Sequence, residues 1–276
     1  MPEIAEIKIM ADGLQQLLCT TENYLFEFDF NPGKAYDEYY PELLQKFRPM
    51  LPLKIERITT NGKKIIVHLA DQKFLVGSMG MSGTFRTEKQ AHSDLWFTFG
   101  AKDSKERNVI YFNDPRKFGL LEILFSEAEL TERLSGLGPD LLANDISLED
   151  FKKLLSKKST QRRKMYTLML DQEFFSGCGN YLKSDILRKA RIHPERILGS
   201  LSEEEFKRLH ESTLTIMRKS YSLGGYSLED YVDINGIKGK YEPLIYNRET
   251  DFEGYKVTVK HYSNRVTYFA EEVQKI

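Results

Sequence analysis

The hydrophobic periodicity of this chain changes once along its length, and this change restricts the possible folds more than any other feature. Between about residues 24 and 126, apolar residues come in short alternating or β-branched runs, such as YLFEFDF, KIIVHLA and NVIYFND, separated by Gly, Asn, Asp and Pro. Such runs are typical of an antiparallel β sandwich or barrel. From Ser147 to about Leu223, apolar residues recur every three to four positions, as in helices. We therefore expect an α+β protein of several domains.

Local signals add detail at both ends of the chain. Apolar residues at helical spacing in MPEIAEIKIMADGLQQLL predict one amphipathic helix that begins at Pro2. Ser147 with Asp150, and Ser202 with Glu205, predict capped starts of later helices. The runs EPLIYNRE, YKVTVKHYS and NRVTYFAEE predict a small hairpin unit at the C-terminal end, after the Gly-rich connector SLGGYSLEDYVDINGIKGKYEP. These changes divide the chain into residues 1–136, 137–225 and 226–276.

Composition excludes several classes of protein. Of the 276 residues, 41% are hydrophobic and 29% are charged, which fits a globular protein with real cores. The chain has neither a run of eighteen apolar residues nor a secretory signal, so we expect a cytoplasmic, nucleoid or nuclear protein that is not secreted. Two isolated thiols, Cys19 and Cys178, indicate a reducing compartment and exclude a zinc site built on several cysteines.

Charge is distributed unevenly although the net charge is only −1. Residues 150–219 contain 16 Lys and Arg against 9 Asp and Glu, and acidic segments flank them. A basic middle of this kind can bind phosphates. A solvated helical surface explains the same charges equally well.

The opening Met-Pro-Glu has two interpretations. Methionine before proline is normally removed after synthesis, which would leave a secondary amine on Pro2 beside Glu3. Such an amine titrates near pH 8, so part of it is neutral and nucleophilic at physiological pH. In the other interpretation, Pro2 starts a helix, where its missing N–H has no cost, and Glu3 complements the helix dipole.

Four stretches in order resemble the formamidopyrimidine-DNA glycosylase and endonuclease VIII family. They are MPEIAE at the start, MGMSGTFR at 79–86, NDPRKFG at 113–119 and DQEFFSGCGNYLKSDILRKARIHPER at 171–196. The resemblance covers nearly the whole chain. It implies an N-terminal helix on a two-layered antiparallel β sandwich, a helical domain with a helix-two-turn-helix, and a C-terminal β-hairpin finger.

The finger departs from the usual family pattern. Many members bind zinc there through four cysteines, but Ala270 and Val273 stand where the last Cys-x-x-Cys would follow TYF. The chain therefore resembles the zincless-finger members, and no cofactor is implied. We expect packing to hold the hairpin together, supplied by five residues: Val257, Val259, Val266, Tyr268 and Phe269.

The resemblance implies a bifunctional DNA glycosylase and AP lyase that acts through a Pro2 Schiff base and β,δ-elimination. Pro2 would be the nucleophile and Glu3 the general acid and base. Lys63, which follows Gly62 at a strand-pair tip, would bind a phosphate at the lesion and assist catalysis. A hairpin-tip lysine can also be merely solvated.

The family's phosphate contacts map onto Lys63, Asn180 and Arg265, which come from three distant segments. Asn180 is expected at the turn before a helix, where amide and N–H groups can hold a phosphate. An ordinary helix N-cap is its alternative role. Arg265 would sit at the tip of the C-terminal hairpin.

Three further residues match those that fill the gap left by a flipped-out base. Met81 would stand beside the partner of the flipped base, Arg116 would read the orphaned base, and Phe118 would wedge the stack. The alternatives are core packing for Met81 and Phe118 and an ion pair with Asp114 for Arg116. Glu6, one turn into the first helix, would approach the extruded base or be an exposed helix carboxylate.

The lesion is not fixed by these motifs. The connector SLEDYVDINGIKGKYEP has the length and glycines of the loop that covers oxidised purines, whereas QEFFSGCGNYLKSDIL is closer to the oxidised-pyrimidine branch, and Ser78 replaces a common histidine. We favour oxidised purines. The expected partner is double-stranded DNA with oxidised bases or abasic sites. We expect the protein to bind it as a monomer and not to bind a membrane. A catalytically silent damage-binding protein of the same fold, or a scaffold that uses only the helix-two-turn-helix, are the alternatives.

Overall fold

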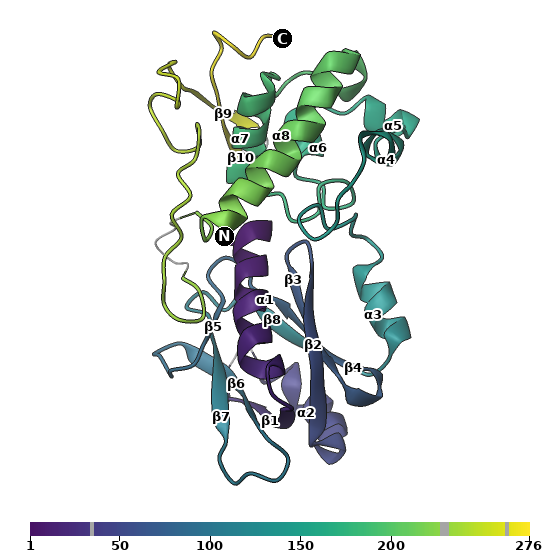
Figure 1. Ribbon diagram of the computed structural model, residues 1–276, viewed down its shortest axis with the longest axis vertical. Coiled ribbons are helices and arrows are strands. Elements are labelled where there is room, and N and C mark those ends of the chain that lie inside the picture. The colour runs from purple at the N-terminus through teal and green to yellow at the C-terminus, as the bar shows by residue number, and fades with distance from the viewer. Residues whose placement is uncertain (34–35, 227–231, 263–264) are drawn as a thin grey trace. The chain divides into compact units, whose positions relative to one another are not determined.

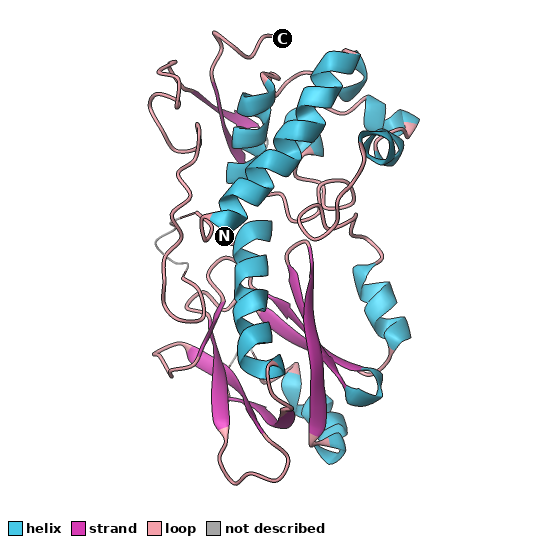
Figure 2. Cartoon of the chain, viewed as in Figure 1, coloured by secondary structure: helices cyan, strands magenta, loops and turns pink. Residues whose placement is uncertain are grey.

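The computed structural model describes residues 1–33, 36–226, 232–262 and 265–276 of the chain (Figure 1). It consists of two compact units. The first contains residues 1–2, 6–135 and 227–239, and the second contains residues 3–5, 136–226 and 240–276. Strands dominate the first unit and helices the second, as the change in periodicity predicts (Figure 2).

The first unit is built on an eight-stranded antiparallel sheet in the order β5-β7-β6-β1-β2-β3-β4-β8. Strands β1 and β2 share only the pairs Tyr24–Lys54 and Leu25–Leu53, so this short junction links two four-stranded halves. Side chains from both halves enter one apolar core, and the predicted sandwich is confirmed. The strands are β1 (Tyr24–Phe30), β2 (Leu53–Asn61), β3 (Lys64–Leu69), β4 (Lys73–Ser78), β5 (Thr84–Arg86), β6 (Ser93–Gly100), β7 (Asn108–Asn113) and β8 (Leu120–Leu124).

Helix α1 (Ile4–Cys19) covers this core through Ile7, Met10 and Leu14. It begins at Ile4 rather than at Pro2, and the Ile4 N–H, which has no acceptor within the helix, donates to the carbonyl of Gly177. The sequence analysis missed helix α2 (Tyr40–Phe47), whose eight residues are too few to show a clear period. Helix α3 (Glu127–Leu134) starts at the capping residue Ser126.

The second unit is mainly helical. Ser202 forms both hydrogen bonds of a capping box with Glu205, as predicted. The Ser147 hydroxyl accepts from the N–H of Asp150 and donates to its carboxylate, which caps α4 in a related way. The helices are α4 (Leu148–Leu154), α5 (Lys158–Gln161), α6 (Met165–Leu168), α7 (Asn180–Ala190) and α8 (Glu203–Ser222).

The C-terminal hairpin consists of β9 (Thr258–Tyr262) and β10 (Arg265–Phe269). The run EPLIYNRE, predicted as a strand, forms none. Its backbone N–H groups at Leu244, Ile245 and Tyr246 donate to the buried carboxylate of Asp185 on α7 instead of to a neighbouring strand. Burial raises the pKa of Asp185 to about 6, although these hydrogen bonds and one from Tyr241 act in the opposite direction.

A second buried group of α7 holds the turn that precedes the hairpin. Arg188 is 1% exposed and forms ion pairs with Asp251 and Glu253, the latter at 2.6 Å between Nη2 and Oε2. Its guanidinium also lies over the rings of Phe252 and Tyr255, 5.1 and 5.6 Å from their centroids. Helix α7 and the hairpin are thereby joined by charge as well as by apolar contact.

An apolar cluster occupies the base of the hairpin. Ala270 is fully buried against Ile245 and Val257, and Val273 packs on them. Of the five residues predicted to hold the hairpin, Val257 and Phe269 are buried and Tyr268 packs on the cluster. The prediction for Val259 is wrong, because this side chain is 52% exposed.

Within the described ranges, no helix is both long and apolar enough to span a lipid bilayer. The same residues contain no group of three or more His, Cys, Asp and Glu side chains arranged to bind a metal ion.

Candidate active site and nucleic-acid interface

The N-terminal residues are fixed at the start of helix α7 in the second unit. Glu3 is 3% exposed, and its carboxylate accepts hydrogen bonds from the N–H groups of Gly179 at 2.6 Å, Tyr181 at 3.0 Å and Leu182 at 3.3 Å. These are the donors that a helix leaves unpaired at its N-terminus, where the helix dipole also favours negative charge. Glu3 is therefore held as a carboxylate in one position, directly after Pro2 in the chain.

The glycines of the GCGN motif make room for this arrangement. A Cβ at Gly179 would lie 2.3 Å from Cδ of Glu3, and a Cβ at Gly177 would lie 2.5 Å from Cβ of Ile4. Gly177 also has φ +83°, which L side chains rarely adopt. Both glycines are thus required by the N-terminal residues that pack on them.

Pro2 is buried and belongs to the coil before α1. While Met1 is attached, the Pro2 nitrogen is a tertiary amide without a basic lone pair. Removal of Met1, which is 41% exposed, would convert it to the secondary amine that the predicted chemistry requires.

Asn180 is the first residue of α7, but it does not cap that helix. Gly179 holds the cap position, so the N-cap alternative is wrong. The Asn180 amide instead donates to the carbonyl of Val266 at 2.8 Å, next to Arg265 at the start of β10. The structure therefore brings Asn180 to the strand that carries Arg265, an exposed residue.

Lys183, which was not predicted from the sequence, supports the contact between Asn180 and the strand that carries Arg265. Lys183 is completely buried and donates to Oδ1 of Asn180 at 2.9 Å and to Oγ1 of Thr267 at 2.7 Å. Burial lowers its pKa to about 8, and Arg265 acts in the same direction, whereas Cys178 and Glu3 oppose the shift. The only sequence signal was a lysine one turn after Asn180 on the same helix face.

In the first unit, Gly62 and Lys63 form the two-residue turn between β2 and β3, as predicted, and Gly62 has φ 57°. Lys63 is partly exposed at this tip. The neighbouring Lys64 donates to the hydroxyl of Ser78, and burial lowers its pKa. The two adjacent lysines, both partly exposed, thus have different surroundings, since a hydrogen bond holds Lys64 at Ser78.

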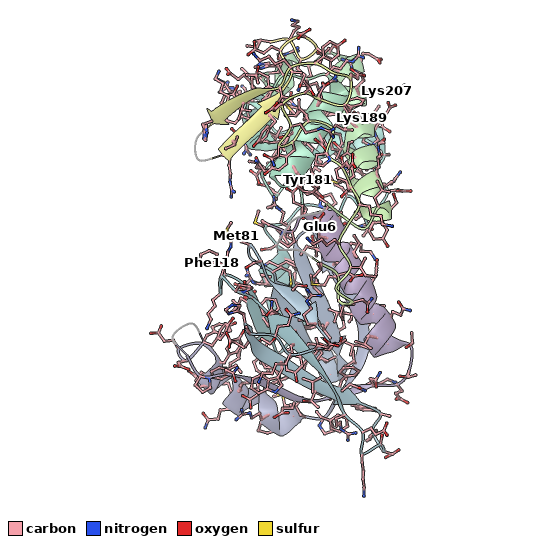
Figure 3. The ribbon with its side chains drawn as sticks, turned by 90° about the vertical axis from the view of Figure 1, so that its left-hand side faces the viewer. Glu6, Met81, Phe118, Tyr181, Lys189 and Lys207 are labelled. Carbon is pink, nitrogen blue, oxygen red and sulfur yellow. The ribbon has the colours of Figure 1, made fainter. Side chains whose placement is uncertain are left out.

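Met81 and Phe118 lie on two adjacent loops of the first unit (Figure 3), and Arg116 belongs to the same loop as Phe118. Nη1 of Arg116 approaches the sulfur of Met81 at 3.7 Å, and the backbone of Gly80 packs on that of Phe118. Met81 is 40% and Phe118 66% exposed, so the core-packing alternative is wrong for both.

The buried carboxylate of Asp114 organises these loops. It accepts from the Ser82 hydroxyl at 2.7 Å, the Gly119 N–H at 2.6 Å and the Arg116 N–H at 3.3 Å. Arg116 thus contacts Asp114 through its backbone. Lys117, between Arg116 and Phe118, turns away and pairs with Asp94 at 3.0 Å.

Glu6 is completely buried, so the alternative of an exposed helix carboxylate is wrong. Part of the connector predicted to cover the lesion, residues 227–231, lies outside the described residues. The part that follows contacts the sandwich: the Val232 carbonyl accepts from Thr84, the Asp233 carbonyl accepts from Arg86, and Ile234 packs on Gly13.

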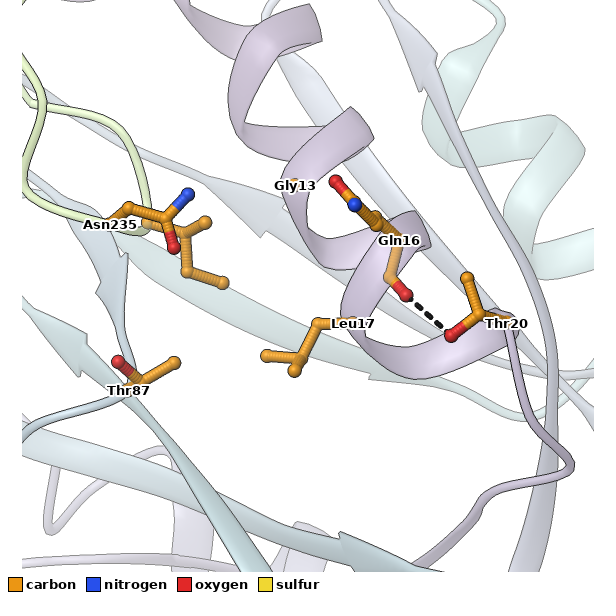
Figure 4. Close-up of a pocket in the computed structure, with 7 residues that line it drawn as sticks. Gly13, Gln16, Leu17, Thr20, Thr87 and Asn235 are labelled. Carbon is orange, nitrogen blue, oxygen red and sulfur yellow. Dashed lines mark hydrogen bonds between the residues drawn. The ribbon is translucent and has the colours of Figure 1, made fainter.

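A hollow of about 420 Å³ lies beside this contact, on the C-terminal half of α1 (Figure 4). It is lined by Gly13, Gln16, Leu17, Thr20, Thr87, Ile234 and Asn235. Its lining contains no ionisable side chain and none of the predicted site residues, so it is not the site of the predicted chemistry.

Comparison with known proteins agrees with this arrangement. Residues 1–121 match the formamidopyrimidine-DNA glycosylase N-terminal domain, and residues 137–232 match the formamidopyrimidine-DNA glycosylase H2TH domain. The formamidopyrimidine-DNA glycosylase of Listeria innocua is 30% identical over 261 residues, which cover 89% of this chain and 87% of the relative. That of Heliobacterium modesticaldum is 32% identical over 197 residues, 70% of each chain.

Solved structures agree in fold. The MutM (Fpg) protein from Thermus thermophilus has a TM-score of 0.82 at 26% identity, covering 99% of this chain and 98% of that one. The Lactococcus lactis Fpg in complex with DNA that contains an abasic site has a TM-score of 0.82 at 24% identity, covering 99% and 100%. The chain belongs to the formamidopyrimidine-DNA glycosylase family.

Proposed function

We propose that this DNA glycosylase of base-excision repair is bifunctional, with its Pro2 amine as the nucleophile for both base removal and strand cleavage. Family membership carries the glycosylase and AP lyase activity. The observation that supports our residue assignment is the fixed carboxylate of Glu3 beside Pro2, held by three N–H groups of α7. The comparisons do not favour the alternative of a catalytically silent damage-binding protein.

The chemistry would proceed in balanced steps. The Pro2 nitrogen forms a bond to C1′ of the damaged nucleotide as the C1′–base bond breaks. The departing base takes a proton from solvent, and the proton that the attacking amine loses passes to the Glu3 carboxylate. Protonation of the ring oxygen by Glu3 opens the sugar and gives an iminium at Pro2. The iminium acidifies C2′, whose proton Glu3 accepts as the 3′ phosphate leaves. A second elimination releases the 5′ phosphate, and water then frees the sugar from Pro2.

Two sets of residues would hold the DNA. Asn180 and Arg265, which share the α7–β10 junction, would contact phosphates together with Lys63 at the β2–β3 tip. Met81, Arg116 and Phe118 would fill the gap left by the flipped base, a role consistent with the exposure of Met81 and Phe118 and with the adjacent loops that carry all three. Buried Glu6 would contribute to the pocket of the extruded base.

We propose oxidised bases in duplex DNA as substrates, with formamidopyrimidine and 8-oxoguanine favoured over oxidised pyrimidines. The relatives named for formamidopyrimidine support this order. The proposal includes a catalytic sandwich over residues 1–136, a DNA-binding domain over 137–225, and a capping loop with a zincless finger over 226–276. It also includes a monomer that acts where the DNA is, in the nucleoid, cytoplasm or nucleus.

Borohydride trapping tests the assignment. The protein, with its N-terminus established by mass spectrometry, is incubated with a duplex that contains one abasic site, and borohydride reduces any iminium to a stable amine. We expect a covalent adduct on the Pro2 nitrogen, and a protein that retains Met1 should give none there. Protein that starts at Pro2 but gives no adduct would refute the nucleophile assignment and favour the damage-binding alternative.

A further inference from the structure

Lys183 is the most unusual charged residue of the second unit. Lysine is almost never fully buried unless it is paired, because removing an ammonium group from water is costly. Lys183 is 0% exposed, yet both of its hydrogen-bond acceptors in the described structure, Asn180 and Thr267, are neutral. A fold that retains a buried cation at such cost is expected to use it.

Its two hydrogen bonds connect the elements that carry the proposed phosphate contacts. Asn180 opens α7, and Thr267 lies on β10, two residues after Arg265. Asn180 also donates to Val266 on the same strand. Lys183 therefore completes a small network of three hydrogen bonds, two of which join the helix to the hairpin.

The network also fixes the orientation of the Asn180 amide. An ammonium group can only donate, so the atom that faces Lys183 must be the amide oxygen. The amide NH₂ then points to the Val266 carbonyl and toward the phenol of Tyr246. The Val266 carbonyl, which can only accept, favours the same orientation, and Lys183 adds a second constraint that keeps the amide donors directed away from the helix interior.

We propose that Lys183 is a positioning residue of the DNA interface, which orients the Asn180 amide, clamps β10 to α7 and places a positive charge behind the phosphate contact. This inference rests on the proposed function, since it takes Asn180 and Arg265 as phosphate contacts. It predicts that phosphate binding and the charge on Lys183 depend on each other.

The mutual dependence has a measurable sign. Burial lowers the pKa of Lys183 to about 8, and the titratable groups around it are Glu3, Cys178 and Arg265, with the phenol of Tyr246 near Asn180. A bound phosphate favours the protonated lysine, so binding takes up a proton wherever free Lys183 is neutral. If the bound form stays protonated, affinity falls about tenfold between pH 7 and pH 9.

The test measures the affinity for a duplex with a non-cleavable abasic analogue, by fluorescence anisotropy from pH 6.5 to 9.5 and at several salt concentrations. Lys183→Arg keeps the charge but does not titrate in this range. This variant should bind the duplex with near wild-type affinity at pH 7. It should lack the fall in affinity between pH 7 and pH 9 that we attribute to Lys183. Lys183→Met should bind at least tenfold more weakly at pH 7, with a shallower salt dependence.

Two controls isolate the effect. Lys189→Met removes an exposed charge from the same helix (Figure 3) and should leave the pH profile unchanged. The N-terminal amine also titrates near pH 8 and contributes to the pH dependence of both proteins. The effect of Lys183 is therefore the difference in the pH dependence of affinity between the wild type and Lys183→Arg.

Identical pH profiles for wild type and Lys183→Arg would overturn the proposal, and this comparison remains valid even if Lys183→Met does not fold. The outcome is also separable from the proposed function. If Lys183 only positions the DNA, borohydride trapping at saturating DNA should persist in Lys183→Arg, whereas an incorrect Pro2 assignment would abolish trapping in the wild type itself.

Discussion

Replacing Arg188 by Met should open the turn before the C-terminal hairpin while leaving the rest of the second unit folded. Arg188 and Asp251 form a buried ion pair, with side chains 1% and 0% exposed. Asp251 in turn accepts from the N–H groups of Glu253 and Tyr255, both at 2.9 Å. Removal of the guanidinium therefore leaves a buried carboxylate without its countercharge at the centre of the turn.

The expected cost follows from this burial. Removing one partner of a buried ion pair typically costs about 3–5 kcal/mol, because the remaining charge is uncompensated. The second pair, with Glu253, contributes less, about 0–1 kcal/mol, since that carboxylate is 36% exposed and screened by solvent. Met fills most of the arginine stem's volume, so a cavity adds little. A cost of about 3–5 kcal/mol corresponds to a roughly 10²- to 10⁴-fold larger population of the opened turn.

Native-state hydrogen exchange measures this opening locally. The amides of Tyr255 and Val257, bonded to Asp251 and to the Glu249 carbonyl, should exchange at least 10²-fold faster in Arg188→Met. Lys189→Met, on the same helix but exposed, is the matched control and should change these rates little.

The double variant Arg188→Met with Asp251→Asn also removes the uncompensated carboxylate. It should therefore recover part of the lost protection against exchange. Exchange within about threefold of wild type in the single variant would refute the reasoning, because the ion pair would then contribute less than about 1 kcal/mol.

Three further predictions concern other parts of the molecule. Gly179→Ala should reduce base excision at least as much as Glu3→Gln, because its Cβ would lie 2.3 Å from Cδ of Glu3; full turnover in an excision assay would contradict the proposed placement. Lys117, at φ 54°, should tolerate Gly but not Val, and thermal unfolding should show Lys117→Val less stable by about 1–2 kcal/mol, with equal stabilities arguing against strain. Two side-chain hydrogen bonds, the stronger one from Lys260, lower the pKa of Glu195 to about 2. The stability that Glu195 gives to the folded protein is therefore present above about pH 4.5 and is lost as the pH falls toward 2. Urea unfolding from pH 3 to 7 should therefore show a smaller acid loss in Glu195→Gln than in the wild type.

Much of the first unit could be predicted because its strands alternate regularly and end at clear turn residues. The run YLFEFDF coincides with β1 (Tyr24–Phe30), and the turn at Gly62 was located from Asn-Gly-Lys. Short elements escaped this method, since the three residues of β5 carry no usable period. The strand predicted for EPLIYNRE does not form, for a different reason. The backbone N–H groups of this run donate to a buried carboxylate of another element, which no local pattern reveals.

The residues of the candidate site also divide into those that could be predicted from the sequence and those that could not. Asn180 and Phe118 were predicted because they stand in short motifs that match the family, and their roles stay predictions. Lys183 and Arg188 could not be predicted, because a lysine and an arginine on a helix normally face solvent. Their partners, Thr267 and Asp251, lie more than sixty residues away in the chain. Only the tertiary structure shows that these two charges are internal.

The GCGN motif shows how such a distant dependence can still leave a mark on the sequence. The turn that starts α7 accounts for only one of its glycines, since only Gly177 has a positive φ. Gly179 is extended, at φ −128°, so any residue could adopt its backbone conformation. The three atoms nearest to a Cβ at this position all belong to Glu3. A glycine 176 positions away from the proposed general acid is therefore part of the same site, and we expect any larger residue there to disturb catalysis before it disturbs the helix.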